Sequence, residues 1–286
     1  MANVASNHEL VIRPTRGWSH LDLAEIWRYR DLLYLLVHRE LVVKYKQTIL
    51  GPAWFVLQPL LMTVVFAVIF GNVAKIPTDG LPPMLFYSGG LLGWNFFAQT
   101  FQGTSSTLVA NASLFGKVYF PRLVVPLAAV ISSLLAFAIQ LLTFLSLFAY
   151  FKIFTSTSSS FGLSRDIVLL PPLLVQIAAL SLGVGLWLAA LTAKYRDFTH
   201  LSSLFIQLWL YATPVIYPLS QIPARWRWVV LVNPMTAPVE TMRHMFLGQG
   251  GATMSQSAFA VVTTLILLLS GVLVFTKVER TFVDRA

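Results

Sequence analysis

The chain has 286 residues, of which 57% are hydrophobic and only 11% are charged, and its formal net charge at pH 7 is +9. A soluble domain of this length needs more charged side chains to cover its surface. The chain contains no cysteine, which excludes disulfides, thiolate-bound metals and iron–sulfur clusters. In a membrane protein, an excess of basic residues is typical of cytoplasmic loops that contact anionic lipid, and we expect no nucleic-acid partner.

The N-terminal fifth of the chain precedes the apolar segments. Residues 1–20 form a polar arm without the apolar core of a secretory signal, and residues 21–52 are predicted to form a cytoplasmic interface helix. At 100° per residue, one side of that helix carries Arg28, Asp31, His38 and Arg39. Six apolar residues fall on the other side, namely Ile26, Tyr29, Leu33, Leu36, Val37 and Leu41. A basic amphipathic helix of this kind is expected to lie in the membrane interface.

Residues 53–286 are predicted to form the transmembrane domain. They contain six apolar stretches, each near or above the roughly 20 residues that a helix needs to cross a bilayer. None of the six contains Asp, Glu, Lys or Arg, and they lie at about 53–74, 84–110, 123–151, 167–193, 198–218 and 257–276. The sequence therefore predicts an all-α polytopic membrane protein with six transmembrane helices.

The connection between the fifth and sixth spans has its own pattern. Residues 226–239 are apolar but cover only about half a membrane thickness, and Pro234 and Pro238 interrupt them. Irregular backbone at membrane depth is tolerated only where it is buried in protein or lines a water-filled cavity. We expect two short re-entrant or gate helices, over 225–232 and 237–246, that close the outer end of a pathway. An outer amphipathic hairpin without a gating role is the alternative.

The distribution of basic residues predicts the orientation. With six spans, the side that holds both termini carries 14 of the 20 bases, and the other side carries six. Because cytoplasmic loops are enriched in Lys and Arg, both termini are expected in the cytoplasm.

The sequence also lacks the residues that would power transport within this chain. Ion-coupled carriers place ionisable groups near the midplane of the membrane, and the six stretches have no acidic or basic side chain there. There is no P-loop motif, so this chain does not bind ATP through one. If the protein moves a substrate uphill, the energy must come from another chain.

Three short segments carry a family resemblance. Residues 44–54 read KYKQTILGPAW and residues 58–60 read QPL, which resembles the start of the first span in type-2 ABC exporter permeases that export polysaccharides. Residues 194–197, KYRD, are similar to the basic loop between spans four and five of that family. The stretch after span five is similar as well, with PVIYP at 214–218 and LVNPMT at 231–236. The three segments occur in family order within a matching six-span layout.

This resemblance implies a transport subunit rather than an enzyme. It implies a permease that exports O-antigen, capsule or teichoic acid across the bacterial inner membrane, with O-antigen favoured. Such permeases work as homodimers with two copies of a separate ATPase, which binds the ATP and magnesium. This chain would then need no cofactor of its own, and its substrate would be a polysaccharide carried on a polyprenyl pyrophosphate.

The implied substrate has an anionic head group, so its portal needs cations at the cytoplasmic interface. Arg39, Lys44 and Lys46 are placed for this role, with Tyr45 as a hydrogen-bond donor. Alternatively, these bases only satisfy the positive-inside preference of membrane proteins.

Aromatic side chains are concentrated in the first, second and fifth stretches, and their faces can stack on sugar rings. The candidates for a passage are Phe55, Phe66, Phe97, Trp209 and Tyr211, with Tyr217 and Trp226 near the outer exit. The alternative is that they are ordinary span residues and interfacial belts.

The cytoplasmic connection over 111–122 is the candidate for docking the ATPase, because apolar residues on such a loop suit a partner groove. The predicted contact residues are Leu114, Phe115, Lys117, Tyr119, Phe120 and Arg122. A turn on the membrane surface is the alternative.

The sequence alone leaves three other functions open. The first is a permease for a small lipid or drug, since fold alone does not identify a substrate. The second is an intramembrane transferase acting on a lipid-linked sugar, for which Glu40 and Asp197 are the only candidate acids. The third is a scaffold for glycan-synthesis enzymes.

Overall fold

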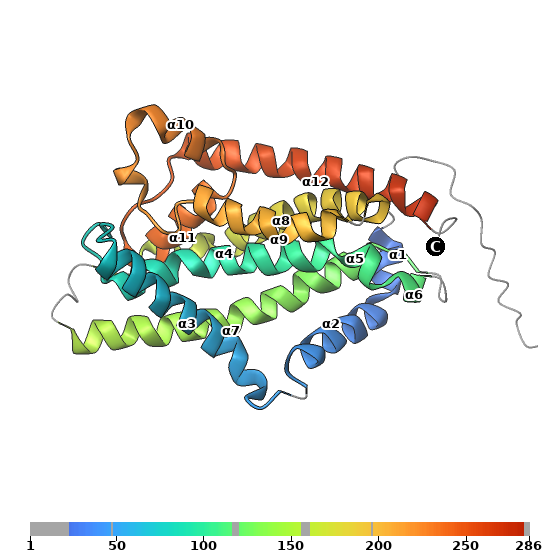
Figure 1. Cartoon of the computed structure of the whole chain (residues 1–286), viewed down its shortest axis with the longest axis horizontal. Coiled ribbons are helices and arrows are strands. Elements are labelled where there is room, and N and C mark those ends of the chain that lie inside the picture. The colour runs from blue at the N-terminus through green and yellow to red at the C-terminus, as the bar shows by residue number, and fades with distance from the viewer. Residues whose placement is uncertain (1–22, 47, 116–119, 156–160, 196, 283–286) are drawn as a thin grey trace, which may run out of the picture.

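The protein is an elongated helical bundle. The computed structural model describes residues 23–46, 48–115, 120–155, 161–195 and 197–282, and within these ranges the regular structure is helical, with no strand. The long helices run along the long axis of the molecule (Figure 1). α1 and the C-terminal end of α12 lie at one end of this axis, while α10, α11 and the α3–α4 connection lie at the other. The predicted polar arm, residues 1–20, falls outside the described residues.

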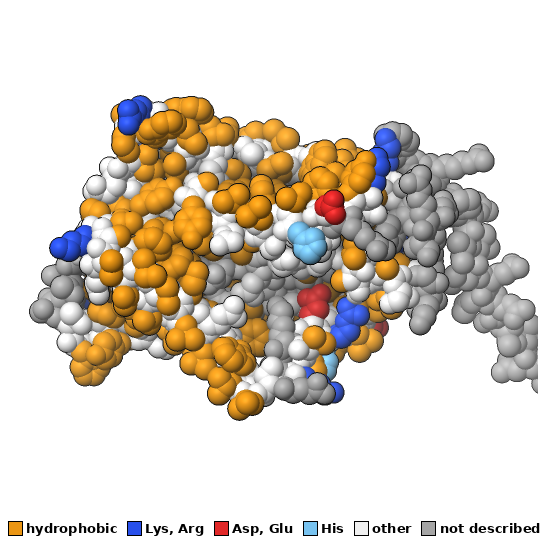
Figure 2. All heavy atoms as spheres, viewed as in Figure 1, with side chains coloured by type: hydrophobic (Ala, Val, Ile, Leu, Met, Phe, Trp, Pro, Cys, Tyr) orange, Lys and Arg blue, Asp and Glu red, His pale blue; other side chains and the backbone are white. Residues whose placement is uncertain are grey.

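In the part of the chain that the structure describes, four helical segments are long and apolar enough to cross a membrane, as a multi-pass membrane protein requires. Each begins and ends within a few residues of one of the predicted apolar stretches. The first is Gly51–Val73, made of η1 (Gly51–Ala53), α3 (Trp54–Phe66) and the π-helical turn η2 (Ala67–Val73), and the second is α7 (Val124–Phe154). The third is Arg165–Lys194, made of η4 (Arg165–Leu169) and α8 (Leu170–Lys194). The fourth is Met254–Glu279 of α12 (Met254–Phe282). Hydrophobic side chains cover most of the middle of one face, and Lys and Arg lie toward its two ends (Figure 2).

The other two predicted spans correspond to helices of a different character. α4 (Pro83–Ser105) has 23 residues, but one of its faces is polar, and α9 (Phe198–Ala212) has only 15 residues. The prediction extended this fifth span to Pro218, whereas α9 ends six residues earlier. The physical reason is Pro214, whose ring disfavours helical backbone at the residue before it, and Thr213 is accordingly extended, with ψ 141°.

Two helices, α1 (Leu23–Arg28) and α2 (Arg30–Tyr45), meet at Tyr29 in the segment predicted to form an interface helix, whose place at the membrane surface stays a prediction. Leu36 and Val37 are buried in a core cluster at this end of the molecule, where α2 packs on α7. The remaining four residues of the predicted apolar arc are partly buried against the same cluster, and Arg28, Asp31 and Arg39 are exposed. The cluster also includes Phe115, which ends the short helix α6 (Ala112–Phe115), and Leu108 of α5 (Thr107–Ala110).

α4 is the central helix of the bundle, since it contacts α3, α7, α8, α9 and α11. Its aromatic residues Phe86, Phe96 and Phe101 are almost fully buried among these neighbours. The connection between α9 and α12 contains η5 (Leu219–Gln221), α10 (Ala224–Val232) and α11 (Thr236–Leu247). α10 and α11 therefore lie within a residue of the two short helices predicted there. α11 packs on α4, α8 and α12, and it ends at Gly248, whose left-handed φ of 72° favours glycine.

The close crossing of α8 and α12 depends on Gly183 of α8. A Cβ at Gly183 would lie 2.7 Å from the backbone of Leu268, which cannot move aside without shifting α12. Alanine normally stabilises a helix by about 1 kcal/mol relative to glycine, but overpacking costs about 1–3 kcal/mol. We expect Gly183→Ala to lower the thermal unfolding midpoint of the detergent-purified protein. Gly162→Ala, which would meet no atom within 4 Å, is the control. Equal midpoints for the two variants would contradict this account.

Candidate functional site

One face of α4 carries a stripe of polar side chains. Ser88, Asn95, Gln99, Gln102 and Ser106 follow one another at intervals of three, four or seven residues, which places them on a single face of a helix. At 1.5 Å per residue, the stripe extends for about 27 Å, most of the thickness of a bilayer core. Phe97 and Phe101 lie on the opposite face of α4, toward α9.

The stripe lines a groove between α4 and α7 on one side and α2 and α3 on the other. We call this the amide groove. Its larger part has a volume of about 890 Å³ and is lined by Gln58, Asn95, Gln99 and Gln140, together with apolar residues of α3. A second part, of about 540 Å³, lies against α2, shares Gln99 with the first, and adds residues of α2, α4 and α7, namely Arg39, Glu40, Val43, Gln102, Gly103, Ser106, Ala129 and Ser133. A narrow cavity of about 20 Å³ beside Ser88 and Asn95 continues the same face of α4.

Most amides of the groove have no partner in the protein. Asn95 Nδ2 donates a hydrogen bond to Gln140 Oε1 at 3.3 Å. Within the described part of the chain, the side-chain amides of Gln58, Gln99 and Gln102 form no hydrogen bond. Leaving such groups unpaired in hydrocarbon costs several kcal/mol each, so they require water or a polar ligand. The groove is therefore a hydrophilic feature inside a membrane domain.

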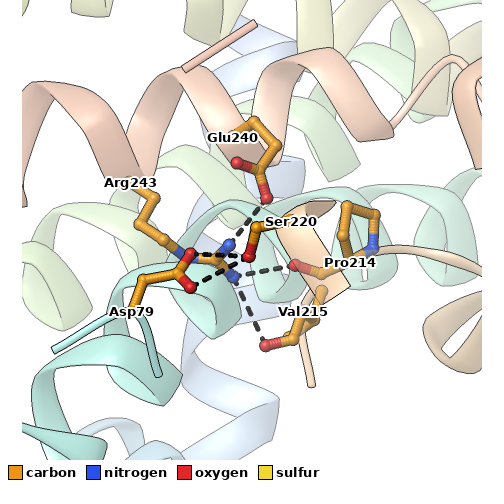
Figure 3. A network of polar contacts seen from close by, with 6 residues as sticks. All are labelled: Asp79, Pro214, Val215, Ser220, Glu240 and Arg243. Carbon is orange, nitrogen blue, oxygen red and sulfur yellow. Dashed lines mark hydrogen bonds and ion pairs between the residues drawn. The ribbon is translucent and has the colours of Figure 1, made fainter. Parts of the chain in front are cut away.

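A second polar feature, a buried ion pair, lies at the opposite end of the bundle from α2. Glu240 and Arg243 are one turn apart on α11, both are at least 97% buried, and Glu240 Oε1 lies 2.7 Å from Arg243 Nη1 (Figure 3). Arg243 Nη2 donates to the carbonyl oxygen of Pro214 at 2.8 Å, with the oxygen of Val215 at 3.4 Å. The guanidinium thus holds the chain that follows α9 against α11.

The surroundings of Arg243 are shaped to receive it. Its guanidinium lies 4.0 Å from the centre of the Phe86 ring, a favourable cation–π position. Gly90 makes the space, since a Cβ there would lie 3.0 Å from Arg243 Nη2. Beside this pair, the Ser220 hydroxyl donates to the carboxylate of Asp79, with oxygen–oxygen distances of 2.9 and 3.2 Å (Figure 3). Three segments distant in sequence, 79–90, 214–220 and 240–243, therefore meet at one point.

Comparison with known proteins identifies the family. A family model described as ABC-2 type transporter matches residues 31–247. The chain belongs to this family. It is similar to two O-antigen export system permease proteins, RfbA, of Klebsiella pneumoniae, at 26% and 27% identity over 254 residues, which cover 89% of this chain and 94% of each relative. A protein of the same name from Myxococcus xanthus is 31% identical over 227 residues, covering 78% of this chain and 82% of the relative.

Family membership makes this chain the permease of an ABC transporter, which works with an ATP-binding partner and is not itself an enzyme. This confirms the family and the transport role that the sequence predicts. Among the described residues, no group of His, Asp and Glu could hold a metal ion.

The predicted portal residues lie at the α2 end of the permease. Arg39 lines the amide groove, and its Nη2 donates to Asn111 Oδ1 at 2.8 Å. Lys46 follows α2 and is exposed. Lys44 and Tyr45 belong to the last turn of α2, but their side chains are outside the described part of the structure. Their role in binding a head group stays a prediction.

The predicted passage residues are divided among four locations. Phe55 alone lines the amide groove. Phe66 is buried beside Tyr87, and Phe97 is buried with its ring edge-on to Trp209 at a centroid distance of 4.8 Å. Tyr211 is exposed on α9. The structure therefore brings Phe97 and Trp209 together, away from Phe55.

Tyr217 and Trp226, the residues predicted near the outer exit, lie on different segments. The Tyr217 hydroxyl donates to the carbonyl oxygen of Tyr211 at 3.1 Å, whereas Trp226 is exposed on α10. Trp209 Nε1 donates to Asn233 Oδ1 at 2.8 Å, so the connection after α10 is bonded back to α9.

The predicted docking segment is largely folded into the permease itself. Phe115 and Phe120 are buried and pack on each other with a centroid distance of 5.6 Å. Arg122 stacks over Phe115 and donates to the backbone oxygen of Glu279 on α12. Leu114 is partly buried, and Lys117 and Tyr119 lie outside the described residues. Docking of the ATPase through this segment stays a prediction.

Neither polar feature was predicted from the sequence. The amides of α4 carry no charge, so a search for charged residues in the spans does not find them, whereas their heptad-like spacing would have done so. Arg243 was counted among bases on the outer side. Its signal was the E-x-x-R spacing within the otherwise mostly apolar segment TAPVETMRHMFL.

The buried pair leads to a second prediction about stability. Arg243→Met leaves the Glu240 carboxylate buried without its partner, which costs roughly 3–5 kcal/mol. We expect a large loss of folded permease in detergent, and partial recovery in Arg243→Met combined with Glu240→Gln. Arg227→Met removes an exposed arginine of α10 and serves as the control. If Arg243→Met and the control have the same unfolding midpoint, the pair does not hold α11 in place.

Proposed function

We propose that this permease exports a lipid-linked O-antigen polysaccharide across the bacterial inner membrane. The observation that carries the proposal is the similarity, over 94% of their length, to permeases named for O-antigen export. The amide groove supports it, because a polysaccharide offers hydroxyl groups to side chains that lack protein partners.

The proposed membrane arrangement has six crossings, made by α3 with η2, α4, α7, α8, α9 and α12. An even number of crossings agrees with Figure 1, where α1 and the end of α12 lie at the same end of the bundle. The excess of basic residues on that side supports its placement in the cytoplasm. α9 spans about 22 Å at 1.5 Å per residue, so the extended chain over 213–218 would complete that crossing.

The proposed assembly contains two copies of this chain and two ATP-binding subunits. The homodimer follows from the resemblance to polysaccharide-exporting permeases. ATP and magnesium are assigned to the partner, since this sequence has no P-loop. The cytoplasmic segment over 111–122 remains the proposed contact with that partner.

In this proposal the substrate enters at the α2 end of the permease. The pyrophosphate head group would be bound by Arg39, Lys44 and Lys46, with a hydrogen bond from Tyr45. Arg39 is already at the rim of the amide groove, which supports a path from the head-group site into the groove.

At the outer end, α10 and α11 would act as gate helices with Tyr217 and Trp226 near the exit. The contacts from Arg243 to the oxygens of Pro214 and Val215 support this role. They couple any movement of α11 to the chain that follows α9.

Deletion of the gene tests the function directly. We expect lipid-linked polysaccharide to accumulate in the cytoplasm and to disappear from the cell surface, because the only step lost is translocation. Labelling with a radioactive sugar, followed by fractionation of surface and internal polymer, measures both pools. The intact gene on a plasmid should restore the surface pool. Normal surface polysaccharide in the deletion strain would refute the proposal and favour a small lipid or drug as substrate.

A charge-neutralised variant tests the portal. We expect Lys44→Gln with Lys46→Gln to lower export and the substrate-stimulated ATPase rate at least ten-fold, since each charge-assisted hydrogen bond contributes about 1.5–3 kcal/mol and about 1.4 kcal/mol corresponds to a factor of ten. Arg28→Gln with Arg30→Gln is the matched control. It removes the same charge from exposed positions of α1 and α2, where the Arg30–Asp31 pair at 3.9 Å contributes little. Equal effects of the two double variants would show that only the total charge matters.

A further inference from the structure

We propose that the amide groove binds an uncharged, hydroxyl-rich segment of the exported chain, and that this permease therefore carries a neutral glycan rather than a polyanion. This inference rests on the proposed function and adds the chemical class of its substrate. It is carried by the side chains of the groove, their missing partners and their spacing.

The lining of the amide groove carries very little charge. Among the described residues that line its three parts, the only charged side chains are Arg39 and Glu40, which have opposite signs and lie at the α2 end. Beyond them the lining consists of amides, hydroxyls and apolar groups. A polymer with a phosphate or carboxylate in every repeat would have to carry charges past α3 and α4 without a cation to pair them, and burying an unpaired charge is costly.

The lining can both donate and accept hydrogen bonds. A side-chain amide offers two donors and one acceptor oxygen, and a sugar hydroxyl both donates and accepts. Gln58, Gln99 and Gln102 have both functions free within the described part of the chain. Phosphate and carboxylate oxygens only accept, so they would leave the amide oxygens of these three residues unpaired.

The amides of α4 are regularly spaced along the groove. Asn95, Gln99 and Gln102 place an amide at every turn of α4, with that of Asn95 also donating to Gln140, so a polymer that advances meets a neutral amide after each short displacement. Phe55 and Trp54 line the same part of the groove and offer aromatic faces to sugar rings. Neutral partners that follow one another along α4 allow the polymer to slide without a single tight binding site.

A pair of substitutions tests the groove. We expect Gln99→Leu with Gln102→Leu to slow the appearance of labelled polysaccharide at the surface about ten-fold, since two hydrogen-bonding partners of the moving chain are lost. Gln99→Asn with Gln102→Asn keeps the amides and should restore much of the rate. Gln207→Leu changes an exposed glutamine of α9 outside the groove and is the control. The amount of folded permease and the basal ATPase rate of the purified transporter should match the control.

The results separate this inference from the proposed function. If deletion of the gene abolishes surface polysaccharide but the leucine pair exports as fast as Gln207→Leu, the function stands and the groove assignment is wrong. If the leucine pair instead changes the oligomeric size of the purified permease, a second copy of the chain covers the groove, which also overturns the assignment.

The polymer itself gives an independent test. The repeat unit that accumulates in the deletion strain can be hydrolysed and analysed for phosphate and uronic acids. We expect neither in the repeat. An anionic group in every repeat would overturn the inference while leaving the export function intact.

Discussion

A polar group at membrane depth needs a partner, and this requirement organises the permease. The protein meets it in two ways. At the end of the bundle opposite α2, Glu240 and Arg243 pair with each other, and Arg243 also donates to backbone oxygens after α9. Along α4, Gln99 and Gln102 are left open to a groove. The first arrangement is closed and structural, whereas the second is open and suited to a ligand.

α4 makes both arrangements possible because its faces differ. Phe97 and Phe101 pack toward α9, Gly90 leaves room for the guanidinium of Arg243, and Asn95 and Gln99 face the groove. A helix with one polar face cannot be exposed to lipid on every side. Its neighbours must therefore cover it on most of its surface, and this explains why α4 occupies the centre of the bundle.

Much of the architecture could be predicted from composition and periodicity. The apolar stretches matching α3, α7, α8 and α12 were found within a few residues, because length and hydropathy alone determine them. The end of α9 was missed by six residues, although Pro214 carried the signal, because an apolar run continues across it. Which aromatic residues face a cavity could not be predicted, since Phe55 and Phe97 differ only in the tertiary packing around them.

The two polar features also differ in how they can respond during transport. The contacts of Arg243 are short, buried and made to α11 and to the chain after α9, so separating those segments would expose a charge at high cost. In the proposed function, the amides of the groove would exchange one neutral partner for another, and water would fill the space between successive sugars. In the proposed function, a rigid end of this kind suits an exit that stays closed until energy is supplied, whereas the groove suits the advance of a long chain. The energy that opens the exit must then be delivered to α11 or to the segment after α9, where Arg243 joins them.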